Sequence, residues 1–338
     1  MKCAVGIMDN NPKQIKIEDK KIFLEIKNLK KYFPIGGNIF SRLRSNLRAI
    51  DGIDFSLGKG ETFGLVGESG CGKSTVARCI LKLIDPTEGQ IFLEGEDICH
   101  LTQRQFRPLR KDVQIIFQDP FSSLNPRMRI KEIVSEPITA HGIANGKEKE
   151  EIVASLLEKV GLKSEYMGRF PHEFSGGQRQ RICIARALAP NPKIIIGDEP
   201  LSALDVSIQA QIVNLLEDLQ NELGFSFIII SHDLAVVEHM CDKVAVMYLG
   251  KIVEMASYQD LYGNPRHPYT IALLSSVPVI DETRQERIIL RGELPNPISP
   301  PKGCRFHTRC PQVMEECKQI EPSLMDLGAG HFVSCYRM

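Results

Sequence analysis

Residues 67–74, with the sequence GESGCGKS, have the types and the spacing needed to hold a phosphate group. They match G-x-x-x-x-G-K-[ST], in which glycines let the backbone wrap around a phosphate with its N–H groups pointing inward. Lys73 would reach the β- and γ-phosphates of a nucleotide, and Ser74 would bind Mg²⁺. We call residues 67–74 the glycine loop. The residues expected to contact phosphate or metal are Gly67, Ser69, Gly70, Cys71, Gly72, Lys73, Ser74 and Thr75.

Two further strand ends carry polar side chains suited to hydrolysis. Asp198 and Glu199 follow an apolar run at 194–196, and His232 follows another at 225–230. Asp198 could hold Mg²⁺, and Glu199 could polarise a water for attack on the γ-phosphate, while His232 could hydrogen-bond that phosphate or the water. Taken alone, the acidic pair could simply start a helix, and the histidine could neighbour a helix cap. With the glycine loop present, we expect a hydrolytic site.

The end of the chain holds a different set of reactive residues. Its cysteines are spaced C-x5-C-x6-C-x17-C, with His307 and His331 between them. Such a proline-rich tail buries little apolar surface and needs a staple to hold one shape. Four thiolates could bind an iron–sulfur cluster or Zn²⁺, and the spacing alone does not separate these from free thiols. The cysteines are Cys304, Cys310, Cys317 and Cys335.

The elements around the glycine loop are expected to be a strand at 63–66 and a helix at about 74–84. Buried parallel strands read as continuous apolar runs, and ligands collect at the carboxyl edge of such a sheet. Apolar residues recur at helical spacing in 152–160 and in 208–219, which predicts two helices that each pack by one face. The sequence therefore predicts an α/β fold in which three strand ends converge on one phosphate.

The composition limits the classes of function. Of 338 residues, 43% are hydrophobic and 25% are charged, with zero net charge. Nothing global argues for a nucleic-acid partner. No apolar run reaches the roughly 18 residues of a membrane span, and the N-terminus has fewer apolar residues than the roughly 7–15 of a secretory signal. We expect a cytoplasmic, reducing compartment, where cysteines are thiols or metal ligands rather than disulfides.

The segment FSGGQ resembles the LSGGQ signature of ATP-binding-cassette (ABC) ATPases, with Phe174 in the usual leucine place. This resemblance implies a P-loop cassette: a RecA-like core, an antiparallel β subdomain and a helical subdomain. It also implies that two cassettes face each other, so that the signature of one closes on the ATP held by the other. We call residues 174–178 the signature segment. Its expected ATP contacts are Ser175, Gly176, Gly177 and Gln178.

The other motifs of the family occur in order. Gln118 matches the glutamine that senses Mg²⁺ and couples to the transport partner, and Asp205 matches the residue that crosses the dimer seam. Phe33, or else Tyr32, matches the aromatic that stacks on adenine; the alternative for Phe33 is a core aromatic at a strand end. Gly197 stands where alanine is usual, and Leu201 where threonine or valine is common. Neither change removes a catalytic group, so we expect a competent ATPase.

Nine of the twenty prolines lie in the last 88 residues, which favours a looped appendage there. This region is similar to the C-terminal part of ATPases that power dipeptide and oligopeptide importers, and the motifs resemble their F-type ATPase. The resemblance implies a D-type ATPase partner, two permease subunits, an extracytoplasmic peptide-binding protein and a place at the cytoplasmic face of the membrane. It also favours a [4Fe–4S] cluster on the four cysteines. Import of nickel or another small solute, and a soluble ABC ATPase acting on nucleic acid or ribosomes, are the alternatives.

The expected organisation is an N-terminal tail (1–20), a nucleotide-binding domain (21–250) with its helical subdomain at about 119–180, and a C-terminal cysteine domain (251–338). One feature is left without a role. Between residues 27 and 48 the chain is basic without an acidic residue, which indicates either a solvated loop or a surface for anionic lipid headgroups. The cationic residues are Lys27, Lys30, Lys31, Arg42, Arg44 and Arg48.

Overall fold

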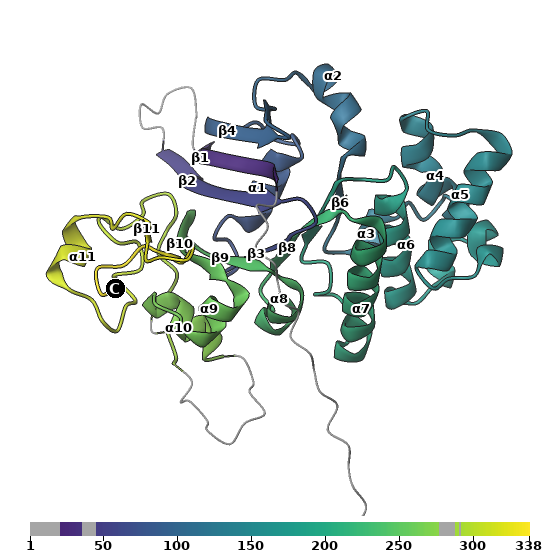
Figure 1. The fold of residues 1–338 in the computed structure, drawn as a ribbon. Coiled ribbons are helices and arrows are strands. Elements are labelled where there is room, and N and C mark those ends of the chain that lie inside the picture. Colours follow the sequence, from purple (N-terminus) through teal and green to yellow (C-terminus); the bar gives the residue numbers. More distant parts are fainter. Residues whose placement is uncertain (1–20, 36–44, 277–287, 291) are drawn as a thin grey trace, which may run out of the picture.

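The computed structural model describes residues 21–35, 45–276, 288–290 and 292–338. Within these residues the chain forms one eight-stranded and one four-stranded β-sheet, with helices packed around both (Figure 1). The N-terminal tail expected at 1–20 lies outside the described residues. The expected α/β class is confirmed.

The larger sheet has the order β11-β12-β10-β9-β3-β8-β7-β6. Strands β6, β7, β8, β3 and β9 run parallel, whereas β10 pairs antiparallel with β9 and β12. The carboxyl ends of β3, β7 and β8 therefore meet at one edge of the sheet. The bounds are β3 Thr62–Val66, β6 Val113–Ile116, β7 Ile194–Asp198, β8 Ser226–Ser231, β9 Lys243–Tyr248, β10 Lys251–Ser257, β11 Met325–Asp326 and β12 Phe332–Val333.

The central strands are covered on both faces. Every residue of β3 and β8 is buried, and so are the first four residues of β7. A strand that is buried on both faces needs apolar side chains at successive positions, which is why these strands were readable from the sequence. The strands expected at 63–66, 194–196 and 225–230 correspond to β3, β7 and β8.

The smaller sheet is antiparallel, in the order β2-β1-β4-β5. Helix α1 (Lys73–Ile80) begins inside the glycine loop, and its buried Val76 and Ile80 share one core with Ile26 of β1 and Phe63 of β3. The helix after the loop is therefore fixed between the two sheets. The bounds are β1 Ile22–Ile35, β2 Ser45–Gly58, β4 Glu88–Leu93 and β5 Glu96–Asp97.

Helix α1 is shorter than we expected: it ends at Ile80 instead of residue 84. Lys82 adopts a left-handed conformation with φ of 52°, which a helix cannot continue through. Its buried ammonium donates to Cys99 O at 2.6 Å and to Asp85 Oδ1 at 2.7 Å. These contacts hold the residue in the conformation that ends the helix.

The helical subdomain lies to one side of the large sheet, where α4, α5 and α6 pack together (Figure 1). Val153, Leu156 and Leu157 are buried on α5, and Ile212 and Leu216 on α7, as their spacing predicted. Helix α6 continues beyond residue 180, where we expected the subdomain to end. The bounds are α2 Gln103–Phe106, α3 Pro120–Ser123, α4 Ile130–Ala140, α5 Gly146–Lys159, α6 Gly176–Leu188, α7 Val206–Leu223 and α8 Leu234–Met240, with 3-10 turns at Arg107–Lys111, Ser164–Gly168 and Pro171–Glu173.

The described residues after 250 share the core of the large sheet and do not form a separate one. Strand β10 pairs with β9 inside the large sheet, and Val253, Tyr269 and Phe306 belong to the same buried cluster as Val66 of β3. The change at residue 250 is therefore a change in composition, and the expected domain boundary falls within a β-hairpin. The helices here are short, as the prolines predicted: α9 Tyr258–Gly263, α10 Pro268–Leu274 and α11 Glu315–Gln319.

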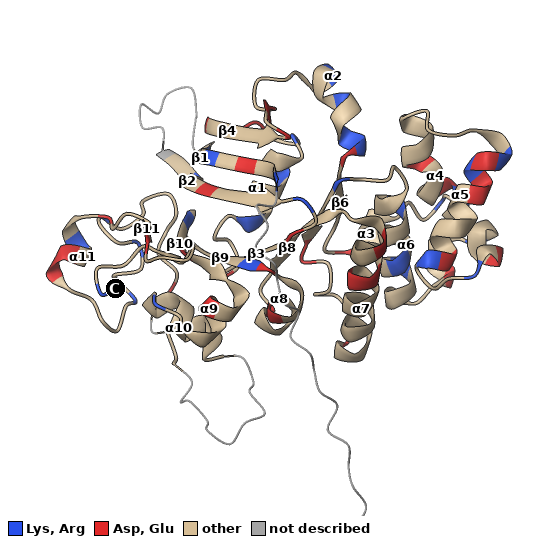
Figure 2. Ribbon diagram, in the orientation of Figure 1, with Lys and Arg blue, Asp and Glu red and all other residues tan. Residues whose placement is uncertain are grey.

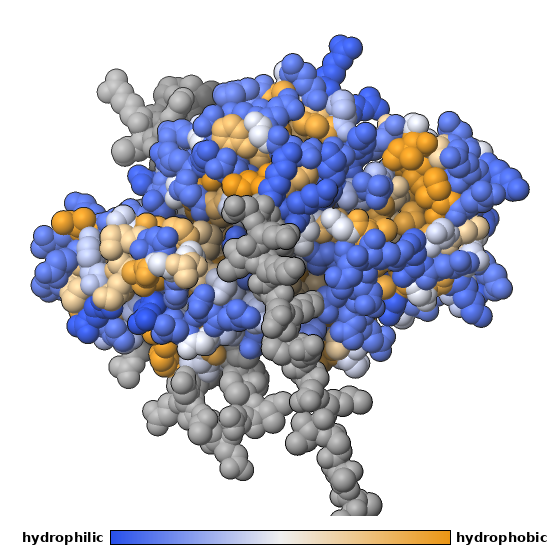
Figure 3. Space-filling model, viewed as in Figure 1, coloured by the Kyte–Doolittle hydropathy of each residue, from blue (hydrophilic) through white to orange (hydrophobic). Residues whose placement is uncertain are grey.

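Charged residues of both signs are mixed over the visible elements, and hydrophilic residues cover most of the face shown (Figures 2 and 3). No helix in the described part of the chain combines the length and the apolar character of a membrane span. Of the basic segment, Arg42 and Arg44 lie outside the described residues. The other four members lie on β1 and β2, where Lys30 pairs with Glu88 at 2.7 Å and Arg48 with Asp51 at 3.5 Å.

Candidate functional site

The glycine loop has the backbone conformation that its sequence predicted. Gly67 and Gly72 have φ values of 148° and 113°, in the range that favours glycine. A Cβ atom at Gly67 would lie 2.1 Å from Met247 O, and one at Gly72 would lie 2.1 Å from Ala49 O. Glycine is thus required here both by the backbone angle and by the close approach of neighbouring strands.

Lys73, the first residue of α1, is buried against the loop and is 4% exposed. Its Nζ donates to Gly67 O at 2.7 Å and to Glu68 O at 3.1 Å. Two backbone carbonyls therefore hold the ammonium group against the loop. A charge so placed can reach a phosphate that the loop backbone surrounds.

Ser74 and Asp198 bring together the loop and the end of β7. Ser74 Oγ donates to Asp198 Oδ1 at 2.7 Å. Burial raises the pKa of Asp198, and the hydrogen bond from Ser74 partly opposes that effect. A hydroxyl and a partly buried carboxylate are oxygen ligands of the kind that Mg²⁺ prefers, so this pair fits a magnesium ion bound beside the phosphates.

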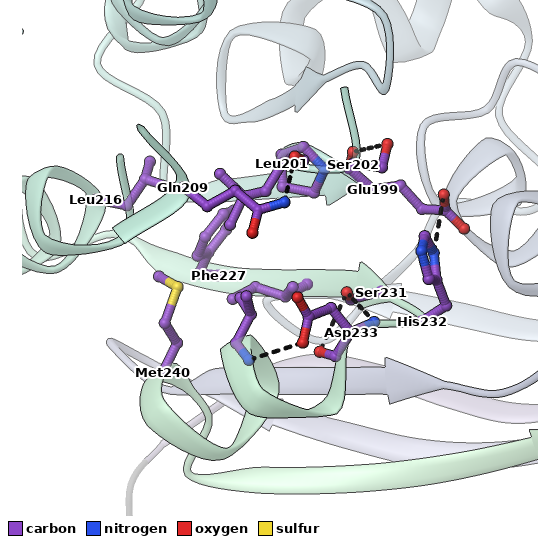
Figure 4. Close-up of a pocket in the computed structure, with 13 residues that line it drawn as sticks. Glu199, Leu201, Ser202, Gln209, Leu216, Phe227, Ser231, His232, Asp233 and Met240 are labelled. Atoms are coloured by element: carbon purple, nitrogen blue, oxygen red, sulfur yellow. Dashed lines mark hydrogen bonds and ion pairs between the residues drawn. The ribbon is translucent and has the colours of Figure 1, made fainter. Parts of the chain in front are cut away.

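Glu199 lies between the other two residues that we expected to act in hydrolysis. Gln118 Nε2 donates to Glu199 Oε2 at 2.9 Å, and His232 Nδ1 lies 3.2 Å from the same oxygen. The facing side chains of Glu199 and His232 are visible in Figure 4. The structure therefore brings the three residues into contact around one carboxylate oxygen at the carboxyl edge of the sheet.

The backbone of Glu199 is held in an uncommon conformation. Its φ is 50°, in the left-handed region, where residues other than glycine, asparagine and aspartate are uncommon. Its N–H donates to Ile230 O at 2.8 Å, which ties the residue to the end of β8. The strain is maintained by this contact and fixes where the carboxylate emerges.

A pocket begins at Glu199 and His232 and is lined by residues of α7, β8 and α8 (Figure 4). Its polar side includes Ser231 and Asp233, and its apolar side includes Phe227 and Met240. Asp233 caps α8 by accepting hydrogen bonds from the N–H groups of Ala235 and Val236. His232 is thus placed on a short, fixed turn between a buried strand and a capped helix.

The signature segment is organised around its own helix. Ser175 caps α6 in a reciprocal capping box: its Oγ accepts from Gln178 N at 3.4 Å, and Gln178 Oε1 accepts from Ser175 N at 3.1 Å. A Cβ atom at Gly177 would lie 2.6 Å from Ile208 of α7. Among the described hydrogen bonds, none joins this segment to the glycine loop, so the structure does not bring these two expected ATP-binding elements together.

Among the described hydrogen bonds and ion pairs, none joins Asp205 or Phe33 to the group around Glu199. Asp205 is the N-cap residue of α7, and its neighbour Val206 is 81% exposed. Phe33 is half-buried near the end of β1, with Lys31 Nζ 5.0 Å from its ring. The alternative aromatic, Tyr32, is hydrogen-bonded through its hydroxyl to Asp51.

The four C-terminal cysteines line a single cavity with His307, although they come from separate segments. All are free thiols, and burial raises the pKa of Cys304 to about 11. Gln312 N donates to Cys310 Sγ and Arg337 N to Cys335 Sγ, each at 3.4 Å. Within the described ranges, however, no three His, Cys, Asp or Glu side chains are grouped closely enough to hold a metal ion. We call this space the cysteine cavity.

The two histidines of the tail have other partners. His331 Nε2 lies 2.8 Å from Glu254 Oε1, and His307 Nδ1 lies 2.8 Å from the carbonyl oxygen of Cys304. The buried carboxylate of Glu254 also accepts from the backbone N–H groups of Arg266 and His267. His331 therefore serves a network that holds the tail to β10.

The structure also places two residues beside the glycine loop that no sequence pattern indicated. Arg309, from the cysteine tail, donates to both carboxylate oxygens of Glu68, at 2.7 and 3.1 Å. The hydroxyl of Tyr269 accepts from the N–H of Glu68 at 2.9 Å. Glu68 occupies an unspecified position of the phosphate-binding pattern, so neither partner had a signal in the sequence.

Comparisons with known proteins agree with this geometry. Residues 50–202 match the family model "ABC transporter", and residues 253–317 match "Oligopeptide/dipeptide transporter, C-terminal region". The chain is 53% identical over 322 residues to the oligopeptide transport ATP-binding protein AppF of Bacillus subtilis, covering 94% of this chain and 98% of that one. It is 51% identical over 328 residues to the oligopeptide transport ATP-binding protein OppF of Salmonella typhimurium, covering 95% and 98%.

Two solved structures resemble the fold. The first is a dimeric, post-hydrolysis state of the ATP-binding cassette MJ0796 bound to ADP and Pi, with a TM-score of 0.62 and 28% identity over 70% of this chain and 98% of that one. The second is cbiO1 of Clostridium perfringens, part of the ABC transporter complex cbiONQ, with a TM-score of 0.62 and 28% identity over 72% and 92%. These similarities confirm the expected ABC cassette fold.

Proposed function

Since this chain belongs to the ATP-binding proteins of oligopeptide ABC transporters, we propose that the glycine loop and the residues around Glu199 form its ATP-hydrolysing site. The chain is an ABC ATPase that energises the import of peptides. The observation that best supports the residue assignment is the contact of Gln118 and His232 with one carboxylate oxygen of Glu199, at the edge where β3, β7 and β8 end.

In this assignment Glu199 is the general base. Its carboxylate accepts a proton from the attacking water, and His232, 3.2 Å away, orients the carboxylate and can hydrogen-bond the γ-phosphate. Gln118 holds the other side of the same carboxylate oxygen at 2.9 Å. These contacts link three separate segments. A movement of the segment that carries Gln118 therefore changes the position of the Glu199 carboxylate.

Lys73 and the loop N–H groups hold the β- and γ-phosphates of the substrate ATP in our proposal. Ser74 and Asp198 would hold Mg²⁺, which supplies positive charge against the charge that builds on the transferred phosphoryl group. The 2.7 Å contact between these two side chains supports the pairing. Phe33 is proposed to stack on the adenine.

We propose that the complete site needs a second ATPase subunit, of the D type, in a heterodimer. The signature segment carries free backbone N–H groups at the start of α6, yet its described hydrogen bonds do not reach this chain's own glycine loop. Val206, beside Asp205, is 81% exposed at the expected seam. The solved structure of the cassette MJ0796 bound to ADP and Pi is dimeric, which supports a site that needs two cassettes.

The remaining partners follow from the transporter class. We propose that the chain is held at the cytoplasmic face of the membrane by two permease subunits and serves an extracytoplasmic peptide-binding protein only indirectly. The exposed Phe117 and Phe121, which flank Gln118, are 41% and 54% exposed and suit an apolar contact with a permease. Such a contact would couple closure of the ATP site to the membrane subunits.

We also propose that the cysteine cavity receives a [4Fe–4S] cluster. Four thiols from separate segments line it, and backbone N–H groups already donate to two of the sulfurs. The side chains are not grouped as a metal site in this structure, so they must draw together when a cluster is bound. A bound cluster would tie separate segments of the tail together.

Co-purification tests the proposal as a whole. The tagged chain, extracted with its membranes in mild detergent, should retain two hydrophobic subunits and a second ATPase, and peptide with its binding protein should stimulate ATP hydrolysis by that complex. Recovery of RNA or ribosomes in place of membrane subunits would contradict the transport function. Stimulation by nickel and not by peptides would contradict the cargo.

A further inference from the structure

We propose that Arg309 is a positioning residue for the glycine loop, and that through Glu68 it couples the cysteine cavity to nucleotide affinity. This inference rests on the proposed function, because it assumes that the loop binds ATP. It concerns a contact between segments that are 241 residues apart in the chain.

The contact between the two residues is specific. Arg309 donates to Glu68 Oε2 at 2.7 Å and to Oε1 at 3.1 Å, so that the planar guanidinium matches the carboxylate with two parallel bonds. The side chain of Arg309 is 8% exposed and that of Glu68 is 28% exposed. A lysine could not reproduce this arrangement, because its ammonium is a single point charge.

Glu68 is also hydrogen-bonded to residues of the glycine loop that are expected to hold phosphate. Its carbonyl oxygen accepts from Lys73 Nζ at 3.1 Å and from Cys71 N at 3.3 Å. Its N–H is fixed by the hydroxyl of Tyr269 at 2.9 Å. Glu68 therefore contacts both Arg309 and Lys73. A shift of Glu68 changes the hydrogen bonding of Lys73 directly.

Arg309 is equally well fixed to the cysteine cavity. It immediately precedes Cys310, and its N–H donates to Phe306 O at 2.9 Å in a tight turn that also joins His307 N to Cys304 O at 3.0 Å. Phe306 is 1% exposed and packs against the ring of Tyr269, with centroids 5.4 Å apart. A movement of Cys304 or Cys310 therefore moves the guanidinium.

Stability alone is a weak reason for this ion pair. Withdrawing a guanidinium from water is costly, and a buried pair often contributes no more to stability than apolar side chains of similar size. Among the described residues, the buried Nε atom of Arg309 has no hydrogen-bond partner, which adds to that cost. The pair is better explained by what it positions: one loop that binds phosphate and one turn that carries two of the four cysteines.

Coupling of this kind must act in both directions. If the state of the cysteine cavity changes the affinity for nucleotide, then nucleotide must change the cysteine cavity by the same free energy. This reciprocity gives two independent measurements, one at each end of the contact. Residues between two coupled sites typically change such coupling by a factor of roughly 2 to 30.

The first measurement is the affinity of the purified chain for Mg²⁺–ADP, by calorimetry, together with KM and kcat for ATP of the assembled complex. We expect Arg309→Gln and Glu68→Gln each to weaken ADP binding and raise KM roughly 2- to 30-fold, with a smaller change in kcat. The double variant should bind ADP no less tightly than whichever single variant binds it less tightly, because both substitutions remove the same contact. Arg309→Lys should lie between. Arg266→Gln is the control, since Arg266 is exposed and its described hydrogen bond uses the backbone N–H.

The second measurement is the rate at which maleimide labels Cys310 in protein from which any bound cluster has been removed, read by mass spectrometry with and without ADP. The rate should depend on ADP in the natural protein and become independent of it in Arg309→Gln. Unchanged ADP affinity in both single variants, additive effects in the double variant, or a fall in kcat alone would overturn the inference. If Arg309→Gln does not fold, Glu68→Asp, which is too short for two parallel bonds, replaces it. Failure of the natural protein to bind ADP would refute the proposed function instead.

Discussion

His232 Nδ1 lies 3.2 Å from Glu199 Oε2, and the two residues sit at the ends of β8 and β7, which are neighbouring parallel strands. The N–H of Glu199 also donates to the carbonyl of Ile230 at 2.8 Å, so the backbone of one strand end holds the other. This relationship fixes the carboxylate against the imidazole before any substrate enters.

Replacing Glu199 by glutamine should leave nucleotide binding intact and lower the rate of hydrolysis by about 10²–10⁴-fold, because a glutamine cannot take a proton from water. Phosphate release by the assembled complex measures the rate, and calorimetry with ATP measures binding. Glu238→Gln, an exposed glutamate on α8, is the matched control. Turnover close to that of the natural protein would rule out Glu199 as the base.

Replacing Lys73 by alanine should weaken binding itself. The buried ammonium makes two hydrogen bonds to loop carbonyls and would exchange them for phosphate oxygens. Hydrogen bonds to charged groups contribute about 1.5–3 kcal/mol, so we expect the Kd for ATP to rise roughly 10- to 150-fold. Lys59→Ala, at an exposed lysine, controls for loss of charge. An unchanged Kd would show that the loop does not hold the phosphates.

Replacing Ser175 by alanine should separate a local effect from an effect on a partner. Loss of the capping box should cost about 1 kcal/mol of stability, yet ADP affinity of the isolated chain should not change, because Ser175 serves nucleotide held by the facing cassette. Hydrolysis by the heterodimer should fall. Thr102→Ala removes the equivalent cap from α2 and is the control for local destabilisation. Equal hydrolysis in the two variants would contradict the two-cassette site.

Stability should depend on pH through His267. Burial lowers the pKa of this imidazole to about 3, from an ordinary value of 6.5. Between these values the unfolded chain binds a proton that the folded chain does not, so the stabilisation is complete above pH 6.5 and declines as the pH falls. This one group contributes a slope of up to about 1.4 kcal/mol per pH unit.

The measurement is the free energy of unfolding in urea between pH 4.5 and 6.5. His267→Asn should flatten the slope while retaining an N-cap acceptor for α10, whereas His239→Asn, at an exposed histidine, should leave it unchanged. Equal slopes in the natural protein and in His267→Asn would show that His267 is not the group responsible. The comparison uses slopes and is therefore insensitive to the stability lost in packing.

Protein purified without oxygen should be brown and contain four iron and four sulfide ions per chain if the cysteine cavity takes the proposed cluster. Cys317→Ser should reduce the iron content sharply, whereas Cys183→Ser, at a buried cysteine of α6, should not. Metal analysis and visible absorbance provide the measurement. Stoichiometric zinc without iron, or metal-free protein with full transport activity, would overturn the assignment.

The local parts of this site could be predicted from sequence because their causes are local. A phosphate-binding turn requires glycine where φ is positive, as at Gly67 and Gly72, and a strand buried on both faces requires an unbroken apolar run, as in β7 and β8. Parallel strands then place Asp198, Glu199 and His232 at one edge whatever the rest of the chain does. We predicted too late an end for α1. The helix ends where Lys82 is held by contacts with Asp85 and Cys99, and the helix propensity of lysine does not reveal those contacts.

Tertiary structure alone decided what lies against these local parts. An apolar spacing tells which face of an element is buried but not which partner covers it, so nothing in the sequence showed that β10 completes the large sheet or that Phe306 packs beside Tyr269. The contact of Arg309 with Glu68 spans 241 residues and depends on how two distant segments pack on the same strands. Sequence determined the chemistry available at the glycine loop; packing determined that the cysteine tail holds that loop in place.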